Sequence, residues 1–542
     1  MGALNRRDFL TLALGAPLAA AACARGTSPR LPDGIIVGAS DRFGHQLRDR
    51  RFEWPGSDRQ VTCDVAIVGA GVAGLTAARA LHRAGVENLI VLELEPELGG
   101  TSRSGHGPLC AYPWGAHYIP LPTRDNPALI ELLTELGAIE GRDAEDQPIA
   151  AEPCLVRDPD ERVFYRGRWY EGLWLQAGAS DADRAELLRF QAIIDQWSAW
   201  RDARGRRAFT VPLSACSDDV QVTALDRESF SAWLSRHDFQ SPRLLWWTDY
   251  ACRDDYGLRA HETSAWAGLF YFAARLIGPG RQEQPLLTWP EGNARLVAAL
   301  AAPVHDRIRT GWAAAELVVQ HESIDVLAVS REHLDALAIR AKQVIVAAPQ
   351  FIARRLIRSW RDNPPLHLDD FQYGAWLVAN LTLYQRPSAR GFPLAWDNVL
   401  YESPALGYVV ATHQTGPEVG PTVLTYYHAL ADHSPSAARE QLLSAPYEQL
   451  ADAVLADLEM AHRELREITT RLDVMRWGHA MIQPRPGFVW GPARSAAARP
   501  YRGIHFAHSD LSGLALFEEA FDRGHSAANA VVAELGREPR SA

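Results

Sequence analysis

The sequence predicts an α/β protein of two domains, one of which is a Rossmann-like dinucleotide-binding domain. The chain is 542 residues long, which is more than one hydrophobic core usually holds. A short apolar run over residues 61–68 leads directly into the glycine-rich turn Gly69–Gly74. This order is typical of a buried parallel strand that enters a phosphate-binding turn.

Three glycines of this turn have separate roles in such a domain. Gly69 permits the tight turn, and Gly71 lets the backbone approach a pyrophosphate. Gly74 allows the following helix to lie close to the strand. The three together indicate a dinucleotide site.

A helix and a second strand follow the turn at the expected distances. The helix is predicted over residues 75–84, and its N-terminal end, with Val72 and Ala73, would face the phosphates. The strand is predicted over residues 88–92 and ends at Glu93. An acid at this point can accept hydrogen bonds from ribose hydroxyls.

Residues 97–102 continue with the sequence Glu-Leu-Gly-Gly-Thr-Ser. Here the chain resembles the flavin amine oxidase superfamily, whose first motif ends in an acid, a short spacer and Gly-Gly-Arg/Thr-Ser. The resemblance implies noncovalent FAD in a domain of the glutathione-reductase type. It also implies that the FAD phosphates meet the backbone of Gly99, Gly100, Thr101 and Ser102. Thr101 stands where many members carry Arg, and Arg103 is the candidate substitute.

The resemblance also divides the chain into two discontinuous domains. Segments 289–293 and 343–349 resemble those at which the family's chain returns to its FAD domain. The FAD-binding domain is therefore expected over residues 61–122, 285–360 and 485–537, and an α+β substrate or cap domain over 123–284 and 361–484. Helices are predicted over 127–136, 182–200, 229–233, 294–300 and 446–460, and strands over 316–320, 324–329, 376–383 and 422–427.

A second cofactor segment is predicted near the C-terminus, where a strand enters a polar turn over residues 503–510 and a helix ends near residue 535. This resembles the closing motif of the superfamily, in which an acid reaches the ribityl or phosphate part of FAD. The resemblance gives that role to Asp510. It also places at the flavin N1–O2 edge the helix N-terminus with Phe517, Glu518 and Ala520. Three positions depart from the motif: His508, Ser509 and Glu519.

The resemblance implies oxidation of the C–N bond of a polyamine-like amine, with a hydride passing to flavin N5. The polar residues chosen as candidate catalytic groups are His117, His479 and Asp255. Asp254, Asp255 and Glu262 are acids that could draw a cationic substrate into the site.

Two features of an amine oxidase are missing from the sequence. Lys342 is the only lysine and falls in a predicted strand of the cofactor domain, so the family's lysine near N5 has no counterpart. Leu516 stands where the family carries an aromatic residue of the amine cage. Two alternatives therefore stay open: a flavin-dependent desaturase or isomerase of an apolar substrate, and a non-catalytic flavin-binding protein.

The composition excludes several other classes of protein. The formal net charge of −11 argues against a nucleic-acid partner. The six cysteines are scattered without metal-ligand spacing, so no metal site is expected, and their disulfide pairing cannot be deduced. None of them falls between Trp477 and Gly487, which favours noncovalent FAD.

The N-terminus carries a targeting pattern. Residues 5–10, Asn-Arg-Arg-Asp-Phe-Leu, are typical of a twin-arginine export signal, and the apolar run that follows is too short to span a bilayer. Residues 1–23 are therefore predicted to be a signal peptide that the twin-arginine export machinery recognises, with the mature protein in the periplasm or cell envelope. Cys23 follows a run that resembles a lipobox, so a lipid anchor there and cleavage without lipidation both stay open. Residues 24–60 are expected to form a linker.

Overall fold

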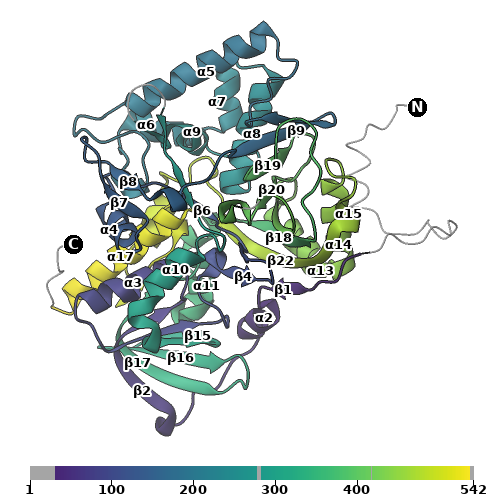
Figure 1. Cartoon of the computed structure of the whole chain (residues 1–542). Helices are drawn as coiled ribbons and strands as arrows, with labels where there is room; N and C mark the ends of the chain where they lie inside the picture. Colours follow the sequence, from purple (N-terminus) through teal and green to yellow (C-terminus); the bar gives the residue numbers. More distant parts are fainter. Residues whose placement is uncertain (1–30, 278–281, 417, 537–542) are drawn as a thin grey trace, which may run out of the picture.

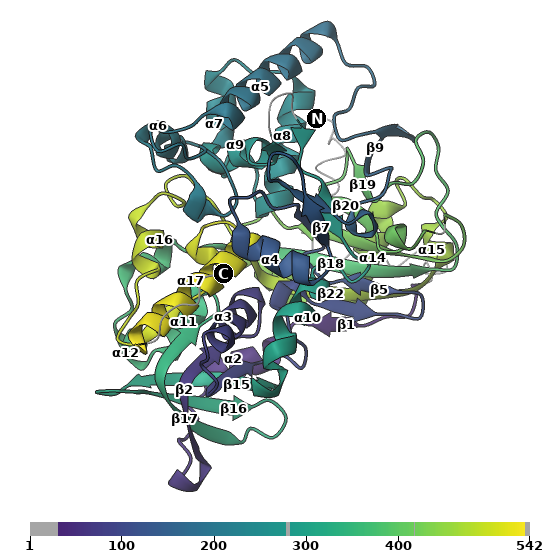
Figure 2. The same ribbon diagram turned by 60° about the vertical axis from the view of Figure 1, so that its left-hand side comes forward.

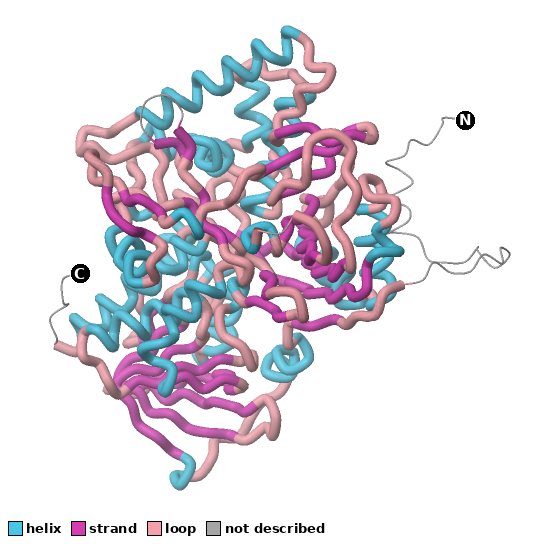
Figure 3. Tube along the Cα trace, viewed as in Figure 1, coloured by secondary structure: helices cyan, strands magenta, loops and turns pink. Residues whose placement is uncertain are grey.

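The computed structural model describes residues 31–277, 282–416 and 418–536 (Figure 1). The predicted signal peptide and Cys23 lie outside the described residues. Most strands belong to two large sheets, which Figure 3 shows as separate groups with helices around them. Each sheet combines segments that are far apart in the sequence.

The first large sheet has the strand order β14-β3-β2-β17-β16-β15, with β23 paired to β17. The strands β2, β3, β14, β17 and β23 pair in parallel, while β15 to β17 are antiparallel. This is the predicted α/β cofactor sheet, and the fold class is confirmed. Its strands are β2 (Gln60–Val68), β3 (Leu89–Glu93), β14 (Ile308–Thr310), β15 (Trp312–Val319), β16 (Ile324–Ser330), β17 (Ala336–Val346) and β23 (Ile504–Phe506).

Three helices pack together on one face of this sheet: α3 (Val72–Arg83), α10 (Ala294–Ala301) and α17 (Phe517–Glu534) (Figure 1). The contact between α3 and α17 is closest at Gly524. A Cβ at this position would lie 2.3 Å from the carbonyl oxygen of Ala73. The N-terminal and C-terminal cofactor segments therefore lie side by side, although more than 400 residues separate Ala73 from Gly524.

The second large sheet has the order β1-β22-β18-β21-β20-β19-β9-β10. It is antiparallel except where β1 pairs with β22 and β19 pairs with β9. Helices α13 (Pro435–Ser444) and α14 (Tyr447–Leu458) pack against it. Its strands are β1 (Ile36–Gly38), β9 (Glu161–Tyr165), β10 (Arg168–Glu171), β18 (Tyr373–Leu383), β19 (Asp397–Leu400), β20 (Gly407–Val410), β21 (Thr422–Ala429) and β22 (Thr469–Ile482).

A helical cap lies at the end of the molecule opposite the cofactor sheet (Figure 2). It consists mainly of α5 (Asp181–Ala199), α7 (Phe230–Arg236), α8 (Pro242–Tyr256) and α9 (Ala265–Ala273). Its core is rich in aromatic side chains, including Phe190, Trp233 and Trp266. The chain enters the cap after β6 (Tyr118–Pro120) and leaves it at β13 (Leu286–Thr288), and these two strands pair with each other.

The other elements are short. The helices are α4 (Pro127–Glu135), α6 (Val220–Thr223), α11 (Gln350–Leu356), α12 (Arg358–Asp362), α15 (Leu465–Ile468) and α16 (Pro492–Ala497). Small strand pairs join β4 (Ser104–His106) to β5 (Ala111–Pro113), β7 (Ile139–Arg142) to β8 (Pro148–Ala150), and β11 (Leu276–Ile277) to β12 (Gln282–Glu283). None of the helices in the described ranges has the length and apolar character that a membrane crossing requires.

The expected linker is corrected by the structure. Within residues 31–60, β1 forms an edge strand of the second sheet and α2 (Asp41–Asp49) packs onto the first. The strand is only three residues long and the helix buries only Phe43. Elements this short produce no periodic pattern that sequence reasoning could recognise.

Candidate functional site

A cavity of about 1360 Å³ is lined by residues of both large sheets and of the cap. All but three of the predicted cofactor-binding residues line it; the exceptions are Gly74, Arg103 and Asp510. The three candidate catalytic residues also line it: His117, His479 and Asp255.

The glycine-rich turn is held by close backbone contacts. Gly69 has a φ of +102°, and a Cβ there would lie 2.6 Å from the carbonyl oxygen of Ala347. A Cβ on Gly74 would lie 1.9 Å from the carbonyl oxygen of Gly69, so α3 can lie against β2 only because this residue is glycine. At Gly71, by contrast, a Cβ would meet nothing within 4 Å in the described part of the chain. Gly71 lines the cavity, so this turn offers open backbone to a bulky ligand.

Glu93 ends β3 at the wall of the cavity. Its carboxylate accepts hydrogen bonds from the backbone N–H groups of Ala70 and Glu95, each at 2.8 Å. Burial raises the pKa of this carboxyl. The two amides orient the group, and its remaining lone pairs can accept from ribose hydroxyls. Next to it, Gly71 is the N-cap of α3 and supplies no side-chain cap, so the first turn of the helix is open to a phosphate.

Arg103 does not line the cavity, so the structure gives no support to the phosphate contact, which stays a prediction. Its Nη1 lies 3.5 Å from Oε2 of Glu95, and its guanidinium lies 5.1 Å from the centroid of the Trp477 ring. The ion pair with Glu95 holds the side chain behind the wall. The arginines that line the cavity outside the cap come from α11, α13, β22 and α2: Arg355, Arg439, Arg476 and Arg48.

Asp510 is also turned away from the cavity. It is fully buried, and its Oδ2 accepts hydrogen bonds from the Tyr373 hydroxyl at 2.6 Å and the Gln350 N–H at 2.8 Å. The ribityl contact of Asp510 stays a prediction, and the hydrogen bonds of Oδ2 do not favour it. The two residues before it, His508 and Ser509, line the cavity instead.

Helix α17 presents its N-terminus to the cavity. Leu516 is its N-cap and makes no side-chain cap, so the first N–H groups are open to a ligand. Burial raises the pKa of Glu518, which lines the cavity, to about 7. Glu519 points elsewhere and accepts a hydrogen bond from the Leu213 N–H at 2.6 Å, which ties α17 to the cap. This structural contact accounts for a glutamate where the family motif has a small residue.

These features fit FAD. The cavity joins open backbone at Gly71, two helix N-termini without side-chain caps and a buried acid at the end of β3. Such a set suits a dinucleotide with a pyrophosphate and a ribose.

Aromatic side chains surround His117 in the part of the cavity beneath the cap. The His117 ring centroid lies 4.9 Å from that of Tyr427, 5.1 Å from Tyr118 and 5.5 Å from Trp396. Burial lowers the pKa of His117 to about 4, so the ring is neutral near pH 7. Nδ1 lies 3.3 Å from the Gly115 carbonyl oxygen, which favours a proton on Nδ1 and leaves Nε2 as an acceptor.

His479 lies in a different part of the cavity. Its ring stacks on Phe351 with centroids 4.2 Å apart and also contacts Tyr373. Burial lowers its pKa to about 4, and the neighbouring Arg439 acts in the same direction. The structure therefore does not bring His479 together with the aromatic residues around His117.

Acidic side chains form another wall beneath the cap. Asp255 binds Arg275, whose Nη2 donates to the two carboxylate oxygens at 2.7 and 2.9 Å. Asp254 has no hydrogen-bond or ion-pair partner among the described residues, and burial together with Asp255 raises its pKa to about 7. Burial, followed by Asp254 and Glu161, raises the pKa of Asp397 well above its usual range. All of these side chains line the cavity.

Glu262, the third acid considered from the sequence, does not line the cavity. It pairs with Arg485 at 2.7 Å. Of the acids in the wall, Glu161 and Asp397 come from the second sheet and carry no motif. Sequence reasoning missed them, as it missed Trp396, Tyr427 and Arg275, because only the folded chain brings them to one place.

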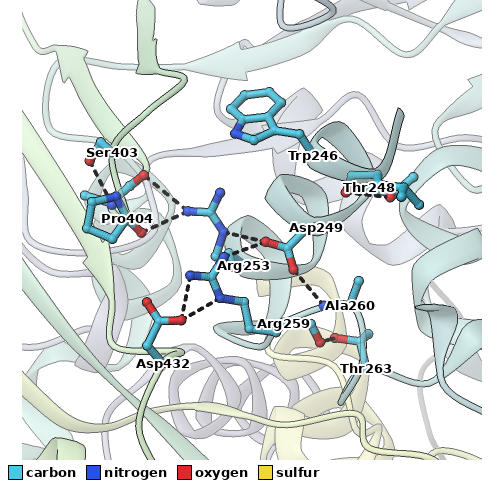
Figure 4. Close-up of polar contacts among 12 residues, drawn as sticks. Trp246, Thr248, Asp249, Arg253, Arg259, Ala260, Thr263, Ser403, Pro404 and Asp432 are labelled. Carbon is cyan, nitrogen blue, oxygen red and sulfur yellow. Dashed lines mark hydrogen bonds and ion pairs between the residues drawn. The ribbon is translucent and has the colours of Figure 1, made fainter. Parts of the chain in front are cut away.

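A partly buried charge network fixes helix α8, which carries Asp254 and Asp255 (Figure 4). Asp249 accepts from Arg259 at 2.6 Å and from Arg253 at 3.2 Å. Arg253 donates to the Pro404 carbonyl at 2.9 Å, and Arg259 donates to Asp432 at 2.6 Å. The network links α8 to loops of the second sheet and so holds the acidic wall in position.

Two residue types are missing from the described lining of the cavity. Lys342 pairs with Asp64 at 2.8 Å on the cofactor sheet and is largely exposed. None of the described cysteines lines the cavity, and all five of them are free thiols. In the described ranges, no group of three or more His, Cys, Asp or Glu side chains is placed to hold a metal ion.

Comparison with known proteins gives consistent matches. Residues 72–532 match the family model of flavin-containing amine oxidoreductases. AofH of Mycobacterium tuberculosis, provisionally assigned as a flavin-containing monoamine oxidase, is 34% identical over 179 residues, and the match spans only 32% of its length and 32% of this chain. The L-amino acid dehydrogenase of Synechocystis is 24% identical over 509 residues, which cover 88% of this chain and 96% of that protein.

Solved structures of two oxidases share the fold. Putrescine oxidase with bound putrescine has a TM-score of 0.63 at 18% identity. Cyclohexylamine oxidase from Brevibacterium oxydans has a TM-score of 0.61 at 17% identity. Both matches cover 88% of this chain and all of the other. At these identities the likeness shows the fold alone.

The open side of Gly71 leads to a testable prediction. Gly71→Leu should fold normally, because a Cβ at this position meets no described atom within 4 Å and the side chain would extend into the cavity, but it should lose bound FAD. Circular dichroism and the visible flavin absorbance of the purified protein measure the two effects. Gly74→Ala is the matched control, and it should lower the melting temperature because its Cβ would lie 1.9 Å from the Gly69 carbonyl. A Gly71→Leu protein with one FAD per chain would contradict the assignment.

Proposed function

Because the chain belongs to the flavin-containing amine oxidoreductase family and is an FAD-dependent oxidoreductase, we propose that it oxidises the C–N bond of an amine that carries a second positive charge. A diamine or polyamine has this character. The single observation that carries the proposal is the acidic wall with Asp254, which lines the cavity without a partner among the described residues.

The charges of the wall favour a cationic ligand. Four carboxyl groups lie there, namely Glu161, Asp254, Asp255 and Asp397, while Arg275 is the cation that lines the cavity beside them. Arg275 is committed to Asp255. Burying the carboxylates of Asp254 and Asp397 is costly, and the raised pKa values of these two groups reflect that cost. A substrate ammonium beside Asp254 and Asp397 would relieve it.

The aromatic residues around His117 supply the second half of the proposal. Trp396, Tyr118 and Tyr427 offer ring faces and edges to the substrate, and ring faces attract cations. Nε2 of neutral His117 can accept a hydrogen bond from the N–H of the neutral reacting amine, which orients the nitrogen lone pair. FAD bound by the glycine-rich turn and the N-terminus of α17 would supply the two-electron oxidising chemistry at this place. The proposal includes noncovalent FAD, which the lack of cysteine in the described cavity lining supports.

The name of one structural neighbour agrees with this choice, since putrescine is a diamine. The other is named for cyclohexylamine, a monoamine, and agrees only with the oxidation of an amine. The acidic wall counts against a desaturase or isomerase of an apolar substrate, because such a ligand would offer no partner to the carboxyl group of Asp254. The large cavity beside the cofactor residues counts against a non-catalytic role.

A cationic L-amino acid is a second candidate substrate, and Arg275 favours it. The hydrogen bonds of its guanidinium to described residues all come from Nη2, which donates to Asp255 and Tyr118. Nη1 and Nε are therefore left for a substrate carboxylate. The dehydrogenase of Synechocystis, which aligns over most of this chain, is named for L-amino acids.

A panel of substrates tests the proposal. Anaerobic mixing with diamines, polyamines and cationic L-amino acids should bleach the flavin absorbance, and a monoamine of equal length should do so poorly. Asp254→Asn should lower kcat/KM for the dication by about 10- to 150-fold, the equivalent of a hydrogen bond to a charged group of about 1.5–3 kcal/mol. The monoamine serves as control and should change little. Equal losses for both substrates, or no bleaching by any amine while light reduces the flavin, would contradict the proposal.

The raised pKa of Asp254 predicts a pH dependence. Below about pH 7 the carboxyl is protonated and neutral, so it pairs weakly with an ammonium; above it the carboxylate is ionised. The ratio of kcat/KM for the dication to that for the monoamine should therefore rise with pH through about 7. The ratio cancels the titration of the reacting amine, which both substrates share. Asp254→Asn should flatten it, and a rise that persists in this variant would assign the titration to another group.

We also propose that the protein is exported through the twin-arginine route and works in the cell envelope. The Arg6-Arg7 pair supports this proposal, because it is typical of a twin-arginine signal. The route also carries folded proteins, which suits a chain that binds its cofactor before export. Replacing both arginines with lysine should keep the FAD-loaded protein in the cytoplasm, as cell fractionation would detect. Cys23→Ala should remove membrane attachment only if Cys23 is lipidated. Unchanged export of the double lysine variant would contradict the proposal.

A further inference from the structure

Residues 31–54 pass from one domain to the other across the cavity. On the substrate side, β1 pairs with β22, and the Val474 N–H donates to the Ile35 carbonyl at 2.9 Å. The Leu472 N–H donates to the Asp33 carbonyl at 2.8 Å. This segment therefore completes one edge of the second sheet.

On the cofactor side, α2 and the chain after it bind the first sheet. Phe43 is 6% exposed and packs with Ala313, Ala315 and two further residues of β15 and β16. The indole N–H of Trp54 donates to Glu316 at 2.9 Å. Residues 31–54 thus have anchors in both domains.

The same segment lines the cavity beside the end of β3. Ser40, His45 and Arg48 are among its lining residues. The Ser40 N–H and hydroxyl donate to the Glu95 carboxylate at 2.9 and 2.7 Å, two residues beyond Glu93. Glu93 holds the position that binds the adenosine ribose in this fold. The segment therefore covers the adenosine end of the FAD site.

We propose that residues 31–54 are a cofactor-binding element, a clasp that encloses the adenosine half of FAD. The clasp lies outside the family model, which matches from residue 72 onward. Ser40 donates a hydrogen bond to Glu95, and Phe43 packs on the first sheet. Strand β1 pairs with β22 of the second domain. FAD can leave this end of the cavity only after the clasp detaches, so cofactor release is coupled to unfolding of residues 31–54.

Hydrogen exchange of the full chain tests the coupling without any substitution. Backbone amides of residues 35–49 should exchange more slowly in the FAD-loaded protein than after FAD has been removed. Equal exchange in the two forms would overturn the proposal. This readout does not depend on any substrate, so its outcome is independent of the proposed amine oxidation.

Substitutions test whether the clasp retains the cofactor. Phe43→Ala should raise the rate of FAD release, followed by the fluorescence of free FAD after dilution, by about ten-fold, which corresponds to about 1.4 kcal/mol. Ser40→Ala should have a smaller effect in the same direction. Phe239→Ala is the matched control, because Phe239 is 3% exposed and belongs to the core of the cap. It should release FAD at the wild-type rate.

Hydrogen exchange measured on the same samples shows whether each substitution has detached the clasp. If Phe43→Ala exposes the amides of residues 35–49 while FAD leaves at the wild-type rate, the clasp does not retain the cofactor. If the amides stay protected in this variant, Phe43→Asp in the full chain replaces it, because it puts a charge into the same buried site. That variant should release FAD faster than wild type, and wild-type retention would overturn the proposal.

Discussion

The arrangement of the whole protein depends on backbone contacts that only glycine permits. At Gly69, Gly74 and Gly524 a Cβ would approach a backbone carbonyl oxygen to 2.6 Å or less. These contacts press α3 against β2 and α17 against α3. As a result, the N-termini of two helices from opposite ends of the chain face one cavity. The cofactor site is thus a consequence of packing between main chains, and side chains such as Arg103 are left to support it from behind.

The electrostatics of the cavity differ between its two ends. The wall beneath the cap holds Asp254 and Asp397, whose pKa values are raised mainly by burial. The walls formed by α11, α13 and β22 hold Arg355, Arg439 and Arg476. A cationic substrate beside Asp254 and Asp397 would lie next to charges of the opposite sign. The charge network around Asp249 matters here, because it holds α8, and with it the acidic wall, against the second sheet.

The sequence predicts the parts of the site that a single segment forms. It does not predict the parts that are built from residues far apart in the chain. The strand, the turn and Glu93 were predictable because a dinucleotide imposes glycines and an acid at fixed spacings. Asp510 was predicted to contact the ribityl chain because it lies one residue from the position of the acid in the family motif. In the structure its carboxylate accepts a hydrogen bond from the Tyr373 hydroxyl. Asp397 begins β19 and Trp396 directly precedes it, and no motif marks either residue. Their role depends on a cap helix more than 100 residues away, which no local pattern records.

The N-terminal region connects the predicted export route with the folding of the two domains and the closure of the cofactor site. The clasp follows the predicted export signal almost directly, and it contacts both domains as well as the cavity between them. In the clasp, β1 pairs with β22 and α2 packs on β15 and β16. The clasp can therefore dock only after both sheets have formed. A chain that docks the clasp has therefore already folded both domains, and with FAD inside it has closed the cofactor site. A route that carries folded proteins suits such a molecule, because an unfolded chain would have to assemble this site after losing access to cytoplasmic FAD.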